Sequence, residues 1–455
     1  MQRMFRGSSP LLLLALAFAA IEVVALPAAA WEKEPLSVFH ERRARLVRET
    51  GADGVIVLAG YREVDVAASV TPFRQNENFY YLTGWNEPDA LLLVVPKSAK
   101  PGNGNPEIDK EVLFIPAHDY RQENWTGPKL GPDDADAPSR TGFPTVKPVA
   151  LFQSALQEAL KTFPKIYTEL TAQPESGEDD FQAKMVANLR KIAPLATLGD
   201  LRSVLTRLRM VKSPGEIALI RKATEASIDA HLAAMKAVRP GVWEYEIAAL
   251  MKYEFERRGC EWPAYPPIVG SGFFSTVLHY DQDDRQMKDG DVVVLDVAGA
   301  YGGYTSDITR TLPVSGHFTS RQREIYEIVL GAQNAAIAAA KPGVYLGRSS
   351  TKGLYEIAFE YLNTHGKDLH GKPLGQYFIH GLSHPIGLNV HDPMDFNQPL
   401  QPGMVVTVEP GIYISEEKLG VRIEDDILIT GNGYELLTRR LPRAADEIEK
   451  VMSER

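Results

Sequence analysis

Short apolar runs alternate with amphipathic stretches through the first half of the chain. Val38–Glu49 has helical periodicity and ends before Gly51, whereas Gly54–Ala59 (GVIVLA) has the apolar, β-branched composition of a buried strand. The same criteria predict helices at Leu151–Leu160 and Asp179–Ile192, and strands at Ala90–Val95, Val112–Ile115 and Lys165–Thr168. We expect the middle two strands to pair across the loop Lys97–Asp109, and Thr126–Pro148 to be an irregular surface connection. This order predicts an α/β N-terminal domain.

Longer helical patterns begin after Lys212. Ser213 is a suitable N-cap, with Pro214 at the first helical position and Glu216 three residues after the cap. This helix should reach Ala237, and further helices are predicted at Trp243–Arg258, at Arg323–Ala340 and from near Ser349. We place the domain boundary near Leu205–Lys212, which divides the chain into a leader (1–30), an N-terminal domain (31–205) and a C-terminal domain (206–455).

Two predicted hairpins in the C-terminal domain each carry a pair of acids. Asp296 lies in the apolar run Asp291–Gly299, and Asp307 lies in the return strand Tyr304–Leu312. A turn at Tyr301-Gly302 would put the two carboxylates directly opposite each other, and a turn at Gly302-Gly303 would make them diagonal neighbours on one face. The alternative is that one acid faces solvent on an edge strand.

The second hairpin repeats this arrangement. The strand Gly403–Glu409 ends in Glu409, and Val421–Leu428 carries Glu424. A turn at Glu416-Glu417 would place these two acids opposite each other. Each half of the domain therefore has two helices followed by a strand pair with two carboxylates, which suits a pseudo-two-fold domain with a site between its halves.

A histidine-rich segment, Tyr377–Asp392, lies between the two hairpins. It contains His380, His384 and His391, and its glycines and Pro385 favour an extended backbone over a helix. Clustered carboxylates repel each other unless a cation is present. Oxygen and imidazole ligands without thiolate suit Mn²⁺, Co²⁺, Zn²⁺ or Fe²⁺, and four acids with one histidine are enough to hold two ions.

Composition limits the location and the partners. The net charge of -10 argues against nucleic acid or anionic lipid as the main partner. Arg3 and Arg6, an apolar run and Ala28-Ala29-Ala30 form a signal peptide, with an uncleaved anchor or cleavage after Ala19 as alternatives. We therefore expect a secreted or periplasmic protein that does not associate with membranes after processing. Its single cysteine, Cys260, excludes an intrachain disulfide and suits a small buried residue.

Four segments together resemble the pita-bread metallopeptidases, family M24, which include methionine aminopeptidase, prolidase and Xaa-Pro aminopeptidase. They are LDVAGAYGGYTSDITRT, HGLSHPIGLNVHD, VEPGIYI and VRIEDDIL, and RMVKSPGEIALIRKA is similar to the segment that leads into the family's catalytic domain. In the N-terminal half, FRQNENFYYLTGWNEPDALLLV and AHDYRQENWTGPKLGP resemble the N-terminal domain of the Xaa-Pro aminopeptidase (aminopeptidase P) branch. The resemblance implies an α/β (α+β) chain with a creatinase/aminopeptidase P-like N-terminal domain and a pseudo-two-fold pita-bread catalytic domain.

The resemblance also implies a role for each site residue. Asp296 would bind one metal, His384 and Glu409 the other, and Asp307 and Glu424 would bridge the pair. His279, His380 and His391 match site histidines that are not ligands, and Arg422 matches an arginine behind the bridging glutamate. All five ligands are present, which disfavours metal-free relatives such as creatinase.

The implied activity is hydrolysis of the N-terminal Xaa-Pro bond of peptides. Two ions, Mn²⁺ first with Zn²⁺ or Co²⁺ as alternatives, would lower the pKa of a bridging water, and the resulting hydroxide would attack the peptide carbonyl. Glu409 would carry the proton to the leaving nitrogen, His279 or His391 would donate to the carbonyl oxygen, and His380 would line the proline pocket. The alternatives are a prolidase restricted to Xaa-Pro dipeptides and a non-catalytic peptide-binding protein. A dimer or tetramer is usual in the resembled family.

Overall fold

The computed structural model describes residues 32–62, 73–97, 107–170, 181–347 and 352–454. The predicted signal peptide (1–30) and most of the predicted loop Lys97–Asp109 lie outside these ranges. Among the described residues, no helix combines the length and apolarity needed to cross a lipid bilayer. Cys260 is buried and unpaired, as expected.

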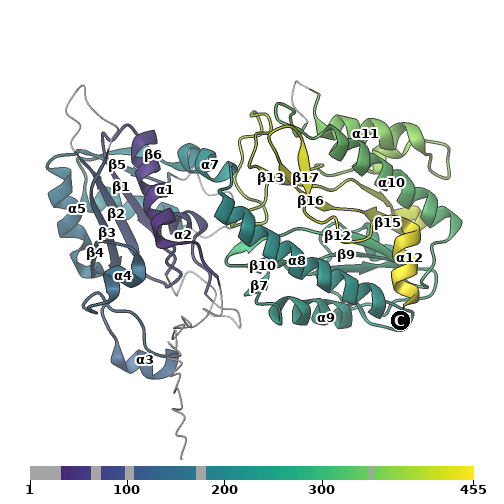
Figure 1. Ribbon diagram of the computed structural model, residues 1–455, viewed down its shortest axis with the longest axis horizontal. Helices are drawn as coiled ribbons and strands as arrows, with labels where there is room; N and C mark the ends of the chain where they lie inside the picture. The colour runs from purple at the N-terminus through teal and green to yellow at the C-terminus, as the bar shows by residue number, and fades with distance from the viewer. Residues whose placement is uncertain (1–31, 63–72, 98–106, 171–180, 348–351, 455) are drawn as a thin grey trace, which may run out of the picture. The chain divides into compact units, whose positions relative to one another are not determined.

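The N-terminal part contains a mixed sheet in the order β4-β3-β2-β1-β5-β6 (Figure 1). The middle pairs, β1 with β2 and β2 with β3, are antiparallel, and the outer pairs are parallel. The strands are β1 (Val55–Ala59), β2 (Leu91–Pro96), β3 (Ile108–Ile115), β4 (Thr145–Pro148), β5 (Lys165–Thr168) and β6 (Thr197–Asp200). Both faces of β1 are buried, because Ile56 and Leu58 belong to one apolar cluster and Val55 and Val57 to another.

The helices of the N-terminal part are α1 (Leu36–Glu49), α2 (Glu77–Thr83), α3 (Tyr120–Thr126), α4 (Ala137–Thr141), α5 (Phe152–Leu160) and α6 (Phe181–Ile192). No residue of α3 is buried, and this helix lies away from the sheet (Figure 1). Both α4 and β4 lie within Thr126–Pro148, so the prediction of an irregular connection there was wrong. Short elements of five and four residues give too little periodicity to be recognised against a Pro- and Gly-rich background.

The C-terminal half starts with α7 (Arg202–Met210) and α8 (Pro214–Ala237). The predicted capping box is present, because Ser213 Oγ accepts from the Glu216 backbone N–H and Glu216 accepts from that of Ser213. The later helices are α9 (Glu244–Glu256), α10 (Ser320–Ala339), α11 (Leu354–His365) and α12 (Ala445–Ser453). The domain boundary suggested at 205–206 falls within α7.

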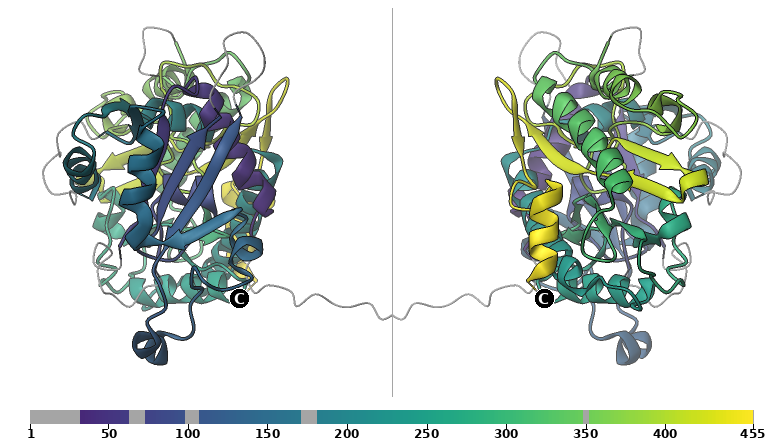
Figure 2. Two further views of the ribbon diagram at one scale, coloured as in Figure 1. Left: turned by 90° about the vertical axis from the view of Figure 1, so that its left-hand side faces the viewer. Right: turned by 90° about the vertical axis from the view of Figure 1, so that its right-hand side faces the viewer.

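The strands of this half form short sheets between the helices. They are β7 (Trp262–Pro263), β8 (Ile268–Ser271), β9 (Val292–Asp296), β10 (Gly299–Tyr301), β11 (Tyr304–Thr305), β12 (Thr309–Pro313), β13 (Val405–Val408), β14 (Gly411–Ile414), β15 (Leu419–Arg422), β16 (Asp425–Ile429) and β17 (Tyr434–Leu436). These strands fall into two groups along the chain, β7 to β12 and β13 to β17. Helix α8 contacts β10 and helix α9 contacts β8 of the first group, whereas α10 contacts β13, β14 and β15 of the second. The side views show the helices outside the strands (Figure 2).

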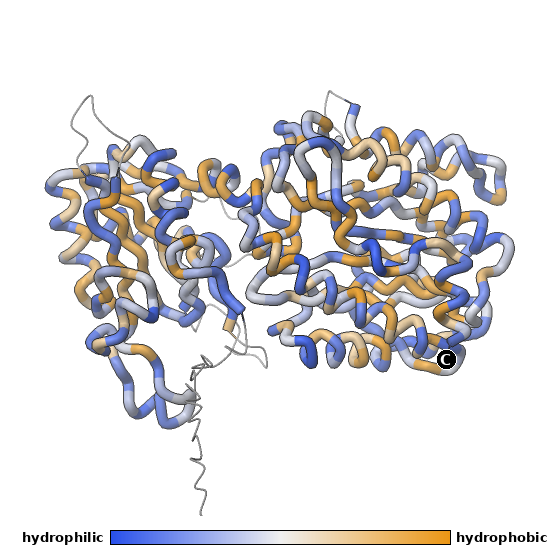
Figure 3. Tube along the Cα trace, in the orientation of Figure 1, coloured by the Kyte–Doolittle hydropathy of each residue, from blue (hydrophilic) through white to orange (hydrophobic). Residues whose placement is uncertain are grey.

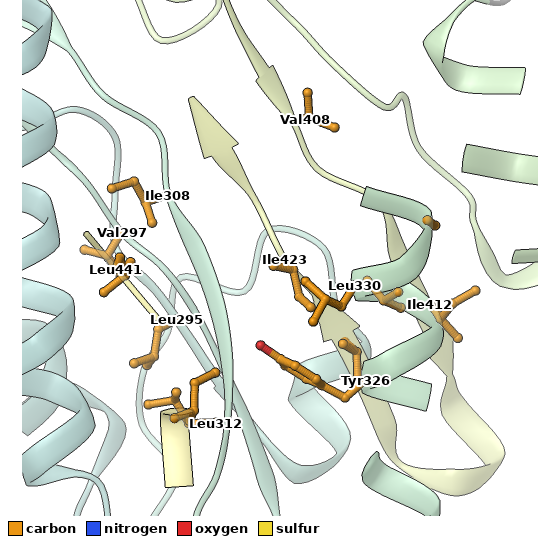
Figure 4. Close-up of a cluster of buried hydrophobic side chains, with 14 of the residues drawn as sticks. Leu295, Val297, Ile308, Leu312, Tyr326, Leu330, Val408, Ile412, Ile423 and Leu441 are labelled. Atoms are coloured by element: carbon orange, nitrogen blue, oxygen red, sulfur yellow. The ribbon is translucent and has the colours of Figure 1, made fainter. Parts of the chain in front are cut away.

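One apolar cluster joins the two groups of strands. Leu295 from β9 and Leu312 from β12 lie near Tyr326 and Leu330 of α10, with Ile412 of β14 on the far side (Figure 4). The colouring by hydropathy shows the same pattern, since apolar segments lie along the strands and polar segments along the outer parts of the helices (Figure 3). This core holds the hairpins that carry the acids in fixed positions.

Regular pairing stops at three of the acids. Asp307 lies between β11 and β12, Glu424 lies between β15 and β16, and Glu409 directly follows β13. The predicted continuous strands Tyr304–Leu312 and Val421–Leu428 are therefore each interrupted at the acid. Local patterning could not show these breaks, because the flanking residues keep strand-like apolar character on both sides.

Candidate metal centre

All nine residues singled out in the sequence line one cavity of about 480 Å³ in the C-terminal half. They are Asp296, Asp307, Glu409 and Glu424, the histidines His279, His380, His384 and His391, and Arg422. The cavity wall also includes Tyr265, Ile268, Leu278, Asp281 and Val390, which sequence reasoning did not select. The chain thus brings together residues that are up to 145 positions apart (279 to 424).

The register of the first hairpin answers the question that the sequence left open. Tyr301 pairs with Tyr304, so the turn is Gly302-Gly303, and both glycines have positive φ, 60° and 82°. Asp296 then pairs with Thr309. Asp307, two residues before Thr309, is therefore the diagonal neighbour of Asp296 and not its direct partner.

The second hairpin has the register that the sequence predicted. Gly411 pairs with Arg422 and Val408 with Asp425, which makes Glu409 and Glu424 opposite positions across the break in the strands. The two hairpins also bond to each other. The Glu424 N–H donates to Thr309 O at 3.1 Å, and the Thr309 hydroxyl donates to Glu424 Oε2 at 2.7 Å.

Residues 382–386 of the histidine-rich segment run along β13, residues 387–391 form bends and a turn, and no part of the segment is α-helical, as predicted. The Thr407 N–H donates to His384 O at 2.9 Å, and the Glu409 N–H donates to Leu382 O at the same distance. This pairing brings His384 Nε2 to 3.4 Å from Asp307 Oδ2 and to 3.4 Å from Glu409 Oε1. Ligand atoms of Asp307, His384 and Glu424 all lie within 4.8 Å of one another.

The cluster has more negative than positive charge, and burial makes the imbalance costly. Burial, together with Asp307 and the other acids, raises the pKa of Glu424 well above its usual value. Burial likewise raises the pKa of Glu409 to about 7 and, with Asp296, raises that of Asp307. Although burial opposes protonation of His384, the carboxylates of Asp307 and Glu409 raise its pKa to about 9. Carboxylates in this state attract a cation.

A chain of hydrogen bonds runs behind the acids. Arg422 Nη2 donates to Asp296 Oδ2 at 2.7 Å, and Nη1 donates to the Tyr413 hydroxyl at 2.8 Å. That hydroxyl lies 2.7 Å from His380 Nε2, while His380 Nδ1 lies 2.7 Å from Gly381 O. This fixes a neutral His380 with its proton on Nδ1, and burial lowers its pKa to about 4. Arg422 thus hydrogen-bonds Asp296 directly, and its Nε donates at 3.3 Å to the Thr309 hydroxyl, which in turn donates to Glu424.

The remaining two histidines are exposed at the cavity wall. The ring of His391 lies edge-on to that of His384, with centroids 4.4 Å apart, and burial and the neighbouring His384 lower its pKa. His279 lies in the loop that follows η2 (Gly272–Thr276). Both rings can reach a bound molecule, which a donor to a developing oxyanion requires.

Tyr265 and Tyr413 are the clearest residues that sequence reasoning missed. The Tyr265 hydroxyl donates to Asp307 Oδ1 at 2.5 Å, and Tyr413 joins Arg422 to His380 as described. Strand alternation could have found Tyr413, because it is four positions after Glu409 and follows Gly411. Tyr265 lies between prolines in WPAYPP and gives no such signal.

The residues present fit a divalent metal. Asp296 Oδ1 is buried and has no protein partner among the described residues, although the other oxygen is held by Arg422. Three acids and a histidine converge beside it with raised pKa values. Carboxylate and imidazole ligands without thiolate are typical of Mn²⁺, Co²⁺ or Zn²⁺ sites.

Comparison with known proteins agrees with this arrangement. Residues 218–431 match the model of metallopeptidase family M24, and residues 39–167 match the aminopeptidase P N-terminal domain. The chain is 36% identical to an Xaa-Pro aminopeptidase of Escherichia coli over 91% of its own length and 97% of the relative's. It is 40% identical to an Xaa-Pro dipeptidase of Pyrococcus furiosus over 80% of its length and 91% of the relative's.

Solved structures give the same result. The structure of aminopeptidase P from E. coli with the inhibitor Pro-Leu superposes with a TM-score of 0.79 at 35% identity, covering 93% of this chain and 99% of that one. The pita-bread architecture expected from the resemblance is therefore confirmed, together with the N-terminal domain that accompanies it.

Proposed function

This chain belongs to metallopeptidase family M24, and we propose that it is an aminopeptidase that hydrolyses the N-terminal Xaa-Pro bond of peptides. The observation that carries the proposal is the convergence of Asp307, His384 and Glu424 beside the unpartnered oxygen of Asp296. The match of the N-terminal region to the aminopeptidase P domain supports the aminopeptidase over other members of the family.

The proposed metal ligands are Asp296, Asp307, His384, Glu409 and Glu424. We infer two ions, with Asp307 and Glu424 shared between them, since five side chains with four carboxylates exceed the needs of one ion in a partly open site. Divalent ions there would lower the pKa of a bound water and so supply hydroxide near neutral pH. Mn²⁺ is the proposed native metal, with Zn²⁺ and Co²⁺ as alternatives, because hard carboxylate oxygens dominate the set.

Residues of the chain would provide proton transfer, stabilisation of the carbonyl oxygen and binding of proline. Glu409 has a side chain 17% exposed, against 7% for Asp307, so it can pass a proton to a leaving nitrogen in the cavity. His279 or His391 would donate to the carbonyl oxygen as it gains charge. His380, held neutral by Tyr413, would line the pocket for the proline ring, whose fixed φ makes it a rigid target.

A comparison of two substrates tests this function. The mature chain (31–455), loaded with Mn²⁺, is assayed with an Xaa-Pro-Yaa tripeptide and with the matching Xaa-Pro dipeptide. We expect release of Xaa from the tripeptide. Cleavage of neither peptide by protein that retains its metal would overturn the proposal.

A prolidase is the second candidate, and the 40% identity to the Pyrococcus dipeptidase favours it. A prolidase must close the pocket beyond proline, whereas an aminopeptidase leaves room for a third residue. Cleavage of the dipeptide alone would select the prolidase. Binding of both peptides without cleavage would select the non-catalytic alternative.

We also propose that residues 1–30 are a signal peptide and that the mature protein is secreted or periplasmic. Mass spectrometry of the N-terminus after expression in a bacterial host tests this. A mature chain that starts at Trp31 supports the proposal, a start at Ala20 supports the alternative cleavage, and an intact Met1 in the cytosolic fraction contradicts it.

The proposed oligomeric state is a dimer or tetramer, as is usual in the resembled family. Light scattering on the purified mature chain measures the mass directly. A monomer at the concentration of the assay would contradict this proposal without affecting the activity.

A further inference from the structure

The loop Pro385–Asp392 folds around the carboxylate of its own last residue. Asp392 Oδ1 accepts from the Asn389 N–H at 3.2 Å, and the Asp392 N–H donates to Pro385 O at 3.0 Å. A Cβ on Gly387 would lie 2.6 Å from Asp392 Cγ, so only glycine lets the backbone approach this closely. The carboxylate thus lies inside the loop whose penultimate residue is His391.

Two cations from outside the loop bind this carboxylate. Arg209 Nη2 donates to Asp392 Oδ1 at 2.5 Å, and Lys212 Nζ donates to Oδ2 at 3.0 Å. Arg209 lies in the last turn of α7, and Lys212 lies between α7 and α8. All three side chains are at most 5% exposed, so the attraction is little screened by solvent.

The two cations are themselves held in place. Arg209 Nη1 donates to Asn78 Oδ1 of α2 at 2.6 Å, and Asn78 Nδ2 donates to Glu169 Oε1 at 2.5 Å. The Lys212 N–H donates to Gly403 O at 2.9 Å. The segment between the sheet of the N-terminal part and α8 is therefore a fixed support for the loop.

The ring of His391 depends on this support. Within the described ranges the ring nitrogens make no hydrogen bond to protein. The backbone of the same residue is held, because the His391 N–H donates to Asn389 Oδ1 at 2.9 Å. The loop has no regular secondary structure. The place of the ring beside His384 is therefore set by the backbone of the loop. Thr305 holds this backbone at Gly387 O and Arg74 holds it at Leu388 O, whereas the carboxylate of Asp392 holds the end that carries His391.

We propose that Arg209 and Lys212 are positioning residues for His391 and act on it through Asp392. The inference rests on the proposed function, because it takes His391 to meet the substrate carbonyl. It assigns the connection between α7 and α8 a part in turnover in addition to its part in the fold.

The test is a double-mutant cycle on kcat. Lys212→Met removes one of the two cations while Arg209 still neutralises Asp392. We expect kcat on the Xaa-Pro-Yaa tripeptide to fall about 10- to 100-fold, since a misplacement of about 1 Å has effects of this size. In the His391→Ala background the same substitution should have little further effect, because the group that it positions is absent.

Matched variants separate this role from a loss of folding. Arg207→Met, on the exposed side of α7 with a side chain 52% exposed, should leave kcat unchanged. Lys212→Arg should recover most of the activity. Arg209→Lys keeps a buried cation but lacks the two nitrogens that bind Asp392 and Asn78 together, so it should lower kcat and serves if Lys212→Met does not fold. Metal content and the thermal transition are measured for every variant, and assays are run well below the lowest transition.

The outcomes are distinct. Equal losses in the wild-type and His391→Ala backgrounds, or unchanged kcat in both Lys212→Met and Arg209→Lys, would overturn the inference and leave the proposed function intact. A metal-loaded wild type that cleaves neither peptide would overturn the proposed function, and this inference with it.

Discussion

Two groups of buried charges lie next to each other in the C-terminal half. They differ in whether protein groups provide the cations and hydrogen-bond donors that buried carboxylates need. Asp425 accepts from Arg310 at 2.7 Å, from Gln333 at 2.9 Å and from the Thr438 hydroxyl. Arg310 in turn donates to the carbonyl oxygens of Thr309, Glu424 and Pro442. Asp425 and Arg310 are both completely buried, and their hydrogen-bonding groups are satisfied by protein.

The preceding residue, Glu424, belongs to the other group. Its neighbours include Asp307, Glu409 and Asp296, which repel it, and one oxygen of Asp296 has no protein partner in the described part of the chain. Protein supplies the cation for Asp425, whereas the cations proposed for the acid cluster would be bound from solution. Adjacent positions on one chain thus serve stability and function, and the contrast between them can be tested.

The largest expected effect on turnover is that of Glu424→Gln. Loss of a proposed shared ligand should lower turnover by about 10³-fold or more. The metal-free protein should be at least as stable as the wild type, because Gln is neutral without the proton that burial and the neighbouring acids make Glu424 take up on folding. Turnover, bound metal and thermal unfolding in chelator measure these effects, with Glu435→Gln, an exposed acid on β17, as the control. Wild-type turnover in Glu424→Gln would remove it from the ligand set.

Arg310→Met should lower stability strongly and turnover only weakly. It leaves the buried Asp425 without its hydrogen-bonded cation, although Arg443 Nη1 remains 3.6 Å from Asp425 Oδ2. The free energy of unfolding should therefore fall by about 3 kcal/mol, the lower end of the range for breaking a buried pair. Turnover per folded molecule should fall far less than in Glu424→Gln. Denaturant unfolding is the measurement, and Arg440→Met, whose pair with Asp229 is exposed, should change stability by less than about 1 kcal/mol. A cost as small as that of Arg440→Met would contradict the structural role.

The pH dependence should separate the metal-free from the metal-loaded protein. Glu409 and His384, with pKa values raised to about 7 and about 9, hold protons that the unfolded chain has already released. The free energy of unfolding of the metal-free protein should therefore fall as pH rises from about 4.5 to 9. Metal must displace these protons, so its apparent affinity should rise by about tenfold per pH unit for each proton released.

Thermal unfolding at pH 5, 7 and 9, in chelator and in Mn²⁺, checks this prediction. The transition in chelator should move to lower temperature with pH, whereas that in Mn²⁺ should move less or in the other direction. Parallel curves under the two conditions would mean that these groups do not bind the metal.

The smallest expected effect is that of Tyr265→Phe. It removes the hydroxyl that orients Asp307 and leaves the ring in place. Loss of such a supporting hydrogen bond should lower metal affinity by about tenfold. Chelator competition measures the affinity, and Tyr245→Phe, 52% exposed on α9, is the control. Equal affinities in the two variants would show that the hydroxyl does not influence the metal.

Short-range patterns along the chain were sufficient to predict the local elements and the candidate ligands. Capping residues placed the start of α8 at Pro214, and an unbroken apolar run marked β1, because both signals come from neighbours in the chain. The register of the second hairpin also followed from local alternation, which is why Glu409 and Glu424 could be paired in advance.

The convergence of these elements, in contrast, depends on the folded chain as a whole. Apolar alternation allowed two turns in the first hairpin, and Gly302-Gly303 was selected in the folded molecule. The strand breaks at Asp307 and Glu424 also appear only in the folded molecule. The hydrogen bonds from Tyr265 to Asp307 and from Arg209 and Lys212 to Asp392 join residues that are 42 to 183 positions apart. Contacts over such distances depend on packing of the whole core, and a local pattern along the chain contains no record of them.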